Sequence, residues 1–263
     1  MDKIGVIVRK EWSEVFKNRL VLGTVVFMPL MLTALPLVLL RVMGAEGGLG
    51  EVGTSDMPAS FARLCEGLSG AECAQYFFVT EFMLLYMLMP LMIPVTIASY
   101  SIVGEKSTRT LEPLLATPIT TIELLAGKGL AAVLPAVGAT WLSFAVFAVG
   151  ARLLGVGSGL VAKFADPMWL LAIFVVGPLL AIASVSFAVM ISSRVNEPRV
   201  AEQLAGLVVL PLLLLFFGQI SGLILLNSSL VLWMAVGLLV LDAGLLAFAV
   251  QLFQRESILT RWK

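Results

Sequence analysis

Apolar residues fall into six long runs along this chain, and polar segments separate the runs. A helix rises about 1.5 Å per residue, so a run of roughly 20 apolar residues crosses a hydrocarbon core about 30 Å thick. Each of the six runs is long enough to do this. We therefore predict six transmembrane helices, at about 20–40, 77–103, 129–150, 168–191, 203–226 and 230–253.

The first 19 residues follow a different pattern. Apolar residues recur there at helical spacing among charged ones, at Ile4, Ile7, Val8, Trp12, Val15 and Phe16. This spacing predicts an amphipathic helix that lies in the membrane interface, with Trp12 at headgroup depth and the basic residues near anionic lipid. The alternative is an amphipathic arm that lies in water.

The longest polar segment with the character of folded structure is 104–128, between the second and third runs. A short helix is predicted over 111–117, because Pro118 cannot continue it. Thr120 and Glu123 then form a capping-box pattern, which opens a second helix toward the third run. We expect a helix, a sharp turn and a helix at the bilayer surface.

The composition of the chain agrees with the prediction of transmembrane helices. The chain has 263 residues, of which 60% are hydrophobic and 13% are charged, and its mean hydropathy is +1.04. An ordinary soluble domain has about 25% charged residues. The chain is therefore expected to be an all-α membrane protein that forms one transmembrane domain over 1–263. Its net charge is zero, so no nucleic-acid partner is expected.

Basic residues predict the orientation in the bilayer. Thirteen of the 17 lysines and arginines lie in the N-terminal 19 residues, in 104–128, in 192–202 and in the C-terminal tail, and four lie in the alternate segments. Lysine and arginine accumulate in cytoplasmic loops. Both termini are therefore predicted to be cytoplasmic, in a multi-pass protein of the plasma membrane.

The segment 41–76 is then the longest external loop. It contains the chain's two cysteines, Cys65 and Cys73. An external compartment permits oxidation, so these residues could close a small loop through a disulfide. The alternative is a pair of free thiols.

Two acids and one glutamine within the apolar runs are candidates for a functional role. Asp242 lies near the middle of the sixth run, Gln219 lies in the fifth, and Glu81 lies toward the outer end of the second. An unpaired acid at mid-membrane depth costs roughly 2.5–3.5 kcal/mol, so Asp242 must be protonated, paired or exposed to a cavity. These side chains either contact a substrate or ion, or form hydrogen bonds between helices.

The residue inventory argues against catalysis. The chain has no histidine, so its serines lack the commonest general base, and the commonest metal ligand is also missing. Two cysteines are too few for a metal site. The sequence contains no G-x-x-x-x-G-K-[ST] phosphate-binding loop. We therefore expect no enzyme activity, no bound metal and no bound cofactor in this chain, and any ATP must be bound by another polypeptide.

The arrangement of these features resembles the membrane subunits of type-2 ABC transporters. These proteins also have six spans with both ends inside, and an amphipathic helix precedes the first span. The segment after the second span matches the family pattern at Glu105, Lys106, Thr110, Leu111, Glu112, Leu114, Leu115, Thr117, Pro118, Gly127 and Lys128. A weaker similarity follows in the second inside loop, 192–202, which precedes a glutamine-bearing fifth span.

The resemblance implies a half-transporter. Two copies, or one copy and a relative, would form the transmembrane unit, and each would bind a separate ATPase subunit that uses ATP and Mg²⁺. The segment 104–128 would be the coupling element. The residues expected to touch the ATPase are Glu105, Arg109, Leu111, Glu112, Leu115, Thr117 and Pro118. The alternative for this segment is a surface helix that rests on lipid.

Two further functions stay open at this point. One is a sodium or cation efflux permease of the same architecture, for which Asp242 and Glu81 are the available acids. The other is a membrane scaffold or assembly protein that transports nothing. The main prediction is the permease subunit of an ABC exporter.

Overall fold

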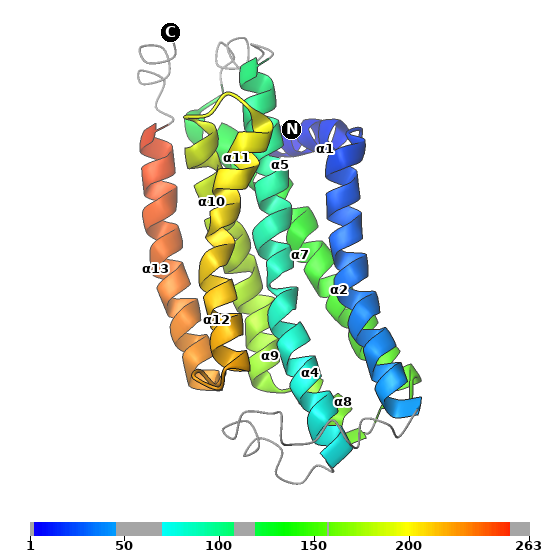
Figure 1. Ribbon diagram of the computed structural model, residues 1–263. Helices are drawn as coiled ribbons and strands as arrows, with labels where there is room; N and C mark the ends of the chain where they lie inside the picture. The colour runs from blue at the N-terminus through cyan, green and yellow to red at the C-terminus, as the bar shows by residue number, and fades with distance from the viewer. Residues whose placement is uncertain (1–2, 46–69, 108–118, 157, 253–263) are drawn as a thin grey trace.

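The computed structural model describes residues 3–45, 70–107, 119–156 and 158–252, and all regular structure within these ranges is helical (Figure 1). Within these ranges, six helical stretches are long and apolar enough to cross a membrane. They are Val21–Met43, Glu72–Glu105, Thr121–Leu153, Val161–Ser192, Pro198–Ile220 and Ser228–Gln251. The prediction of an all-α protein with six spans is confirmed.

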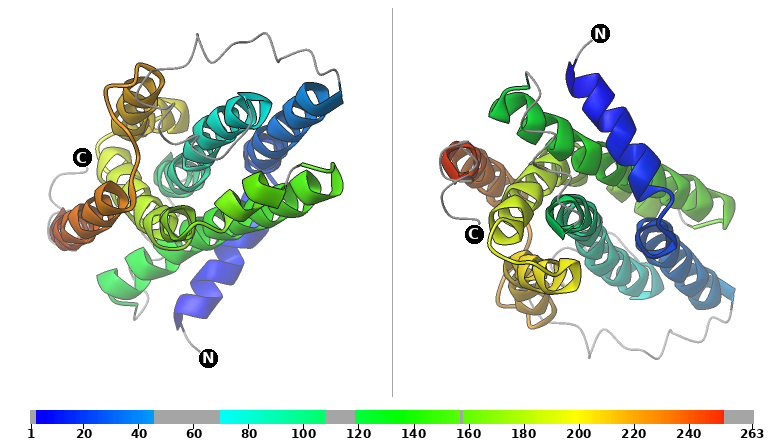
Figure 2. Two further views of the ribbon diagram at one scale, coloured as in Figure 1. Left: turned by 90° about the horizontal axis from the view of Figure 1, so that it is seen from below. Right: turned by 90° about the horizontal axis from the view of Figure 1, so that it is seen from above.

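The chain begins with α1 (Lys3–Val15), which lies across one end of the bundle (Figure 2). Its buried residues, Ile7, Glu11 and Val15, are four positions apart and therefore share one face. The first span, α2 (Arg19–Ala45), follows after a short turn. The last turns of α13 lie at the same end of the bundle as α1 (Figure 1). We call this the α1 end.

The second span is the centre of the bundle. It consists of α4 (Gly70–Tyr86) and α5 (Leu88–Ser107). In its most apolar window 78% of the residues are buried, against 17% in both the fifth and sixth spans. Both sides of the second span therefore face protein, whereas the fifth and sixth spans are peripheral.

The third span, α7 (Thr121–Leu153), is longer than predicted. The predicted second helix of the 104–128 segment and the predicted span at 129–150 form one continuous helix of 33 residues. The capping box is confirmed: Thr120 Oγ1 accepts from the Glu123 N–H at 3.2 Å, and Glu123 Oε2 accepts from the Thr120 N–H at 2.8 Å. The helix ends at Leu153, and Gly155, whose φ of 74° favours glycine, turns the chain just beyond it.

The fourth span is interrupted twice. Helix α8 (Ser158–Phe164) precedes α9 (Pro167–Leu171), a π-helical segment η2 (Ala172–Val176) and α10 (Gly177–Ser192). The fifth span combines α11 (Pro198–Ala205), the 3₁₀ segment η3 (Gly206–Val209) and α12 (Leu210–Ile220). The sixth is α13 (Ser228–Leu252).

Three prolines lie next to irregular turns within the spans. Pro90, Pro178 and Pro211 each follow a break, at Met87, in η2 and in η3 respectively. A proline lacks the N–H that would bond the carbonyl four residues back, and its ring crowds that carbonyl. The preceding turn can therefore widen into a π turn or tighten into a 3₁₀ turn. Pro29, Pro36, Pro94 and Pro135 lie within continuous helices, so a proline permits a break but does not by itself determine its position.

Several element ends differ from the sequence-based boundaries. The helix α2 continues to Ala45 and α4 begins at Gly70, so part of the predicted loop 41–76 is helical. The fifth span begins at Pro198 and ends at Ile220, not at 203 and 226. It ends there because Gly222, with φ of 72°, turns the chain and the Leu223 N–H bonds the Gly218 carbonyl at 3.0 Å.

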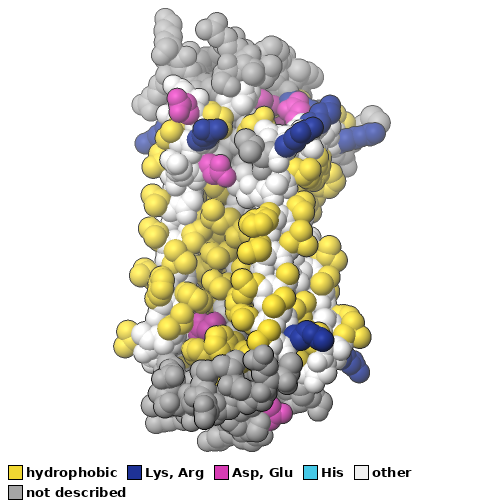
Figure 3. Space-filling model, turned by 45° about the vertical axis from the view of Figure 1, so that its right-hand side comes forward, with side chains coloured by type: hydrophobic (Ala, Val, Ile, Leu, Met, Phe, Trp, Pro, Cys, Tyr) yellow, Lys and Arg dark blue, Asp and Glu magenta, His cyan; other side chains and the backbone are white. Residues whose placement is uncertain are grey.

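Charged side chains on one face of the molecule gather mostly near its two ends, and apolar side chains cover the middle (Figure 3). This distribution is typical of a protein whose middle contacts hydrocarbon.

Candidate functional site: a buried ion cluster at the α1 end

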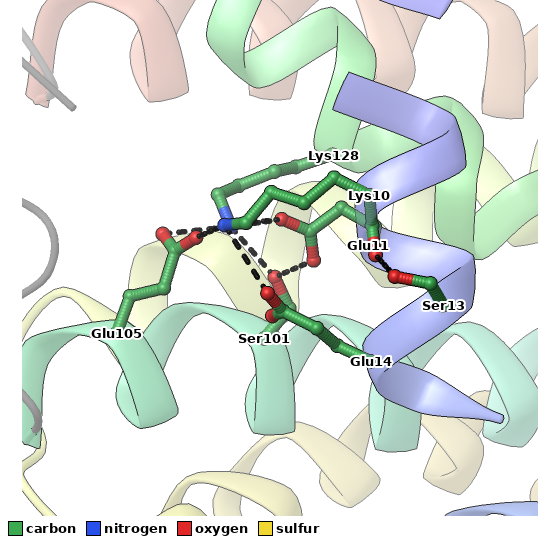
Figure 4. Close-up of polar contacts among 7 residues, drawn as sticks. All are labelled: Lys10, Glu11, Ser13, Glu14, Ser101, Glu105 and Lys128. Carbon is green, nitrogen blue, oxygen red and sulfur yellow. Dashed lines mark hydrogen bonds and ion pairs between the residues drawn. The ribbon is translucent and has the colours of Figure 1, made fainter. Parts of the chain in front are cut away.

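A compact set of ionised side chains joins α1, α5 and α7 at the α1 end (Figure 4). We call Lys10, Glu11, Ser101, Glu105 and Lys128 the ion cluster. Its centre is Lys128, whose side chain is only 5% exposed. The Lys128 ammonium lies 2.7 Å from Glu11 Oε1, 2.8 Å from Glu105 Oε2 and 2.7 Å from Ser101 Oγ.

The other members complete the cluster. Ser101 Oγ donates to Glu11 Oε2 at 2.5 Å. Lys10 Nζ donates to Glu105 Oε1 at 2.5 Å and lies 3.8 Å from Glu11 Oε1. Two ammonium groups thus face two carboxylates, so the cluster carries no net charge. Buried charges are tolerated only when they are paired and hydrogen-bonded in this way.

Lys10 lies at the open side of the cluster, where its side chain is 39% exposed. Burial alone would lower the pKa of its ammonium group. The hydrogen bond and charge of Glu105, together with the carboxylates of Glu11 and Glu14, outweigh burial and hold this pKa above its ordinary value. Lys10 therefore stays charged throughout the neutral range.

Close packing between α1 and α7 sets the geometry of the cluster. Gly127 directly precedes Lys128, and a Cβ atom at Gly127 would lie 2.7 Å from Ile7 Cγ2. The glycine therefore allows α1 to approach closely. One turn further along α7, Trp12 Nε1 donates to the Ala131 carbonyl at 2.9 Å. Lys3 and Glu123 form an exposed ion pair at 3.3 Å.

These contacts define what the cluster can do. Within the described part of the chain, no group of three or more histidine, cysteine or acidic residues could hold a metal ion. The carboxylates of the cluster are occupied by lysines, so they are not free to bind a substrate. The arrangement instead fixes three helices to one another at the two ends of the 108–118 segment.

Most of the predicted coupling residues lie outside the described residues: Arg109, Leu111, Glu112, Leu115, Thr117 and Pro118. Glu105 is described. It is 6% exposed and is bound to Lys10 and Lys128. The structure therefore gives Glu105 a role in joining helices, and its contact with an ATPase stays a prediction.

The three polar candidates Glu81, Gln219 and Asp242 are all buried, but the structure does not bring them together as one site. Glu81 on α4 lies beside Gln219 on α12. Asp242 lies on α13 and is 4% exposed. Neither of its carboxylate oxygens has a hydrogen-bond partner among the described residues.

Cys73 is buried near the start of α4, whereas Cys65 lies outside the described residues. The disulfide between them stays a prediction.

A second polar feature borders the same stretch of α5, where its lining residue Tyr100 directly precedes Ser101. We call it the polar cleft; its volume is about 580 Å³, and it is lined by Asn18, Thr24, Thr96, Tyr100, Glu197, Pro198, Arg199 and Glu202. Thr96 Oγ1 donates to Glu202 Oε1 at 2.7 Å, which ties α5 to α11. The cleft therefore lies between the beginning of α2, the α5 helix and the α11 helix.

Sequence reasoning missed Lys10, Glu11 and Ser101 and treated Lys128 only as part of a motif. One signal was present. Glu11 lies four residues from Ile7 and from Val15, so it occupies the apolar face of the amphipathic helix. An acid in that position needs a buried basic partner, and Lys128 at the edge of an apolar run is a suitable one. Trp12 was expected at headgroup depth, but its indole contacts α7.

The fold and the cluster define a multi-pass helical membrane protein whose interhelical ion pairs gather at one end. A sequence model of the ABC-2 family transporter proteins matches residues 6–236. The chain therefore belongs to the ABC-2 transporter family and is a membrane permease of an ABC transporter. A search of curated proteins finds no match to this sequence.

Proposed function

We propose that this chain is the permease subunit of an ABC exporter, that two permease subunits form its substrate pathway, and that a separate ATPase subunit docks on the 108–118 segment. We further infer that the α1 end faces the cytoplasm and that the protein resides in the plasma membrane. Membership of the ABC-2 family supports the need for an ATPase, and the count of basic residues supports the orientation.

The observation that carries the proposal is the ion cluster. Glu105 lies three residues before the 108–118 segment, and Lys128 lies ten residues after it. Because both side chains meet in one cluster with Glu11, a force on the segment reaches α1, α5 and α7 together. A segment attached to one helix alone would move that helix alone.

The mechanism follows from this attachment. ATP binding closes the ATPase pair, and the docked segment moves with it. The three clustered helices then move as one body, which tilts the second and third spans relative to the partner permease and opens the pathway alternately to the two sides. The permease then has two arrangements, one open to each side of the membrane. The ATP-bound ATPase pair shifts the equilibrium between them only by the difference in its affinity for the two.

The polar cleft is a suitable inner mouth for the pathway. It lies at the α1 end beside the second span, and it presents hydroxyl groups, two carboxylates and one guanidinium group. When a polar or charged substrate enters this cleft, hydrogen bonds to these groups would replace those it loses to water.

The docking proposal is tested with the double variant Leu111→Glu and Leu115→Glu. Apolar anchors in a partner's groove lose their binding energy when they become charged. We expect this variant to insert into the membrane but to lose co-purification with the ATPase. A matched control is Val6→Glu with Ile122→Glu, which makes the same chemical change at exposed positions of the α1 end. Full co-purification of the ATPase with the first variant would contradict the docking proposal.

Cation efflux is a second candidate, and one observation favours it. Asp242 is buried within the sixth span, and its carboxylate oxygens have no hydrogen-bond partner among the described residues. Asp242→Asn keeps the shape and removes the charge. Loss of sodium-dependent ATPase stimulation in this variant would support a cation as the substrate, and unchanged stimulation would argue for a packing role. A scaffold without transport would show no substrate-stimulated ATPase activity at all.

A further inference from the structure

An apolar cleft of about 350 Å³ lies between the second, fourth, fifth and sixth spans. We call it the apolar cleft. Its lining side chains are aliphatic, thioether or indole groups, and they include Met87, Trp169, Ala172, Leu212 and Met234. Its volume falls within the range of about 300–1,000 Å³ that is usual for ligand sites. It shares no lining residue with the polar cleft and none with the ion cluster.

The mouth of the apolar cleft lies between α12 and α13. Pro211 on α12 and Gly237 on α13 line the cleft and are exposed, and the Leu241 side chain beside them is 49% exposed. Neighbouring apolar side chains on the outer surface are more exposed still, at 72% for Leu214 and 70% for Val240. The mouth therefore opens sideways through the surface that the spans present to lipid.

Three of the four spans are irregular where they border the cleft. The break at Met87, the π segment through Ala172 and Val176, and the 3₁₀ segment at Val208 all contribute lining residues. Irregular turns leave a helix unable to pack evenly on its neighbours, and π segments occur frequently at functional sites. The cleft is thus built by the backbone of several spans.

We propose that the apolar cleft binds one acyl chain of a membrane phospholipid, which enters sideways between α12 and α13. Among the lining side chains, the indole N–H of Trp169 is the one group that could donate a hydrogen bond to water, so the walls are a poor site for water. The hydrocarbon that surrounds the spans is the medium at the mouth, and its chemistry matches the lining. Because the lining contains no charged side chain to pair with a headgroup, the headgroup stays in the interface and only the chain is bound.

Fluorescence quenching tests the proposal. Trp169 lines the cleft and is only 4% exposed. The full chain and its Trp169→Phe variant are reconstituted in phosphatidylcholine vesicles with and without bromine on the acyl chains. The difference between the two proteins gives the Trp169 emission. We expect loss of most of this emission in the brominated vesicles, because a brominated chain lies against the indole.

A variant whose new side chain fills the cleft provides a second test of the proposal. A side chain at Gly237 meets nothing within 4 Å of its Cβ position, so Gly237→Leu should fold and occupy part of the cleft. The matched control is Gly244→Leu, on the same helix with equally open space but outside the cleft. We expect Gly237→Leu to restore Trp169 emission in brominated vesicles and to reduce phosphatidylcholine retained in native mass spectrometry. The control should do neither.

Two results would overturn the acyl-chain site. One is Trp169 emission that brominated lipid leaves unchanged in the full chain. The other is equal quenching in Gly237→Leu and in the full chain, since bromine outside the cleft would then be responsible. Neither result depends on the presence of an ATPase.

Discussion

The ion cluster and the apolar cleft hold helices together in opposite ways. In the cluster, ammonium, carboxylate and hydroxyl groups meet at 2.5–2.8 Å across α1, α5 and α7. In the cleft, the second, fourth, fifth and sixth spans surround a space of about 350 Å³ with apolar walls. The first region depends on direction and charge, and the second depends on apolar contact alone.

The difference shows how one permease can combine firm attachment with adaptable packing. Charge pairs in a buried site have one good geometry, so the helices that share them keep their relative positions. Apolar surfaces accept many arrangements at similar free energy, particularly beside lipid. Substitutions should therefore be costly in the cluster and mild in the cleft.

The largest effect is expected for Lys128→Met. This change keeps the length of the side chain but leaves Glu11 and Glu105 without their shared ammonium group. Breaking a buried pair by removing one partner destabilises a protein by about 3–5 kcal/mol. We expect a lower apparent Tm in detergent, measured by loss of the monodisperse peak on heating.

Two further variants test whether the loss of stability is specific to the ion cluster. Lys17→Met removes an exposed lysine outside the cluster and should leave the apparent Tm nearly unchanged. Adding Glu11→Gln and Glu105→Gln to Lys128→Met should recover part of the loss, because no buried carboxylate is then left unpaired and the partly exposed Lys10 keeps Glu14 at 3.7 Å. If the triple variant is no more stable than the single one, charge pairing is not what holds the cluster.

Gly127→Val should give the next largest effect. The added side chain would overlap Ile7 and push α1 away from α7, and overpacking typically costs about 1–3 kcal/mol. Gly237→Val makes the same change at the apolar cleft, where nothing lies within 4 Å. We expect Gly237→Val to change the unfolding free energy by less than about 1 kcal/mol. Both variants are compared by thermal unfolding. Equal losses of stability in Gly127→Val and Gly237→Val would contradict the difference in packing between the two regions.

Thr120→Ala tests the start of α7. The change removes the Oγ1 acceptor for the Glu123 N–H, and the loss of an N-cap side chain costs about 1 kcal/mol. Hydrogen exchange measured by mass spectrometry should rise in the first turn of α7 and not at Ala131. Thr120→Ser keeps the acceptor and should exchange like the parent protein. Unchanged protection in Thr120→Ala would show that the ion cluster alone fixes this turn.

Lys10→Met should have the smallest effect, at most about 1 kcal/mol, because the side chain is partly exposed and solvent screens its charge. Its pKa is raised in the folded state, so its contribution is complete below the unfolded pKa and is lost as pH rises through the folded pKa. The stability difference between the parent and Lys10→Met should therefore be constant near neutrality and vanish at strongly alkaline pH. A difference that grows with pH would contradict the raised pKa.

Much of the fold followed from the sequence, because periodicity and run length are local properties. The six spans, the amphipathic first helix and the Thr120–Glu123 capping box all follow from residues close together in the chain. The ion cluster does not. Lys10 and Glu105 are 95 positions apart, and Glu11 and Lys128 are 117 apart. Pairs at that separation depend on how whole helices pack, which no single segment specifies.

The apolar cleft was still harder to foresee. Its lining residues are ordinary leucines, methionines and valines, which occur throughout the spans. Pro90, Pro178 and Pro211 lie next to the irregular turns, but nothing in the sequence indicates that these turns face one space. Conversely, the predicted docking residues from Arg109 to Pro118 lie outside the described residues, so their role still rests on the motif and on the family.

The central claim is that α1 and α7 move as one body when the ATPase works. Lys3 Nζ on α1 lies 3.3 Å from Glu123 Oε1 on α7. Replacing both residues by cysteine therefore places two thiols within reach of a short cleavable cross-linker. ATP hydrolysis by the assembled transporter is then measured before cross-linking, after it and after cleavage, with the parent chain as the control for its own cysteines. We predict equal substrate-stimulated ATP hydrolysis in all three states. Stimulation that disappears on cross-linking and returns on cleavage would show that α1 must separate from α7, and it would contradict the account.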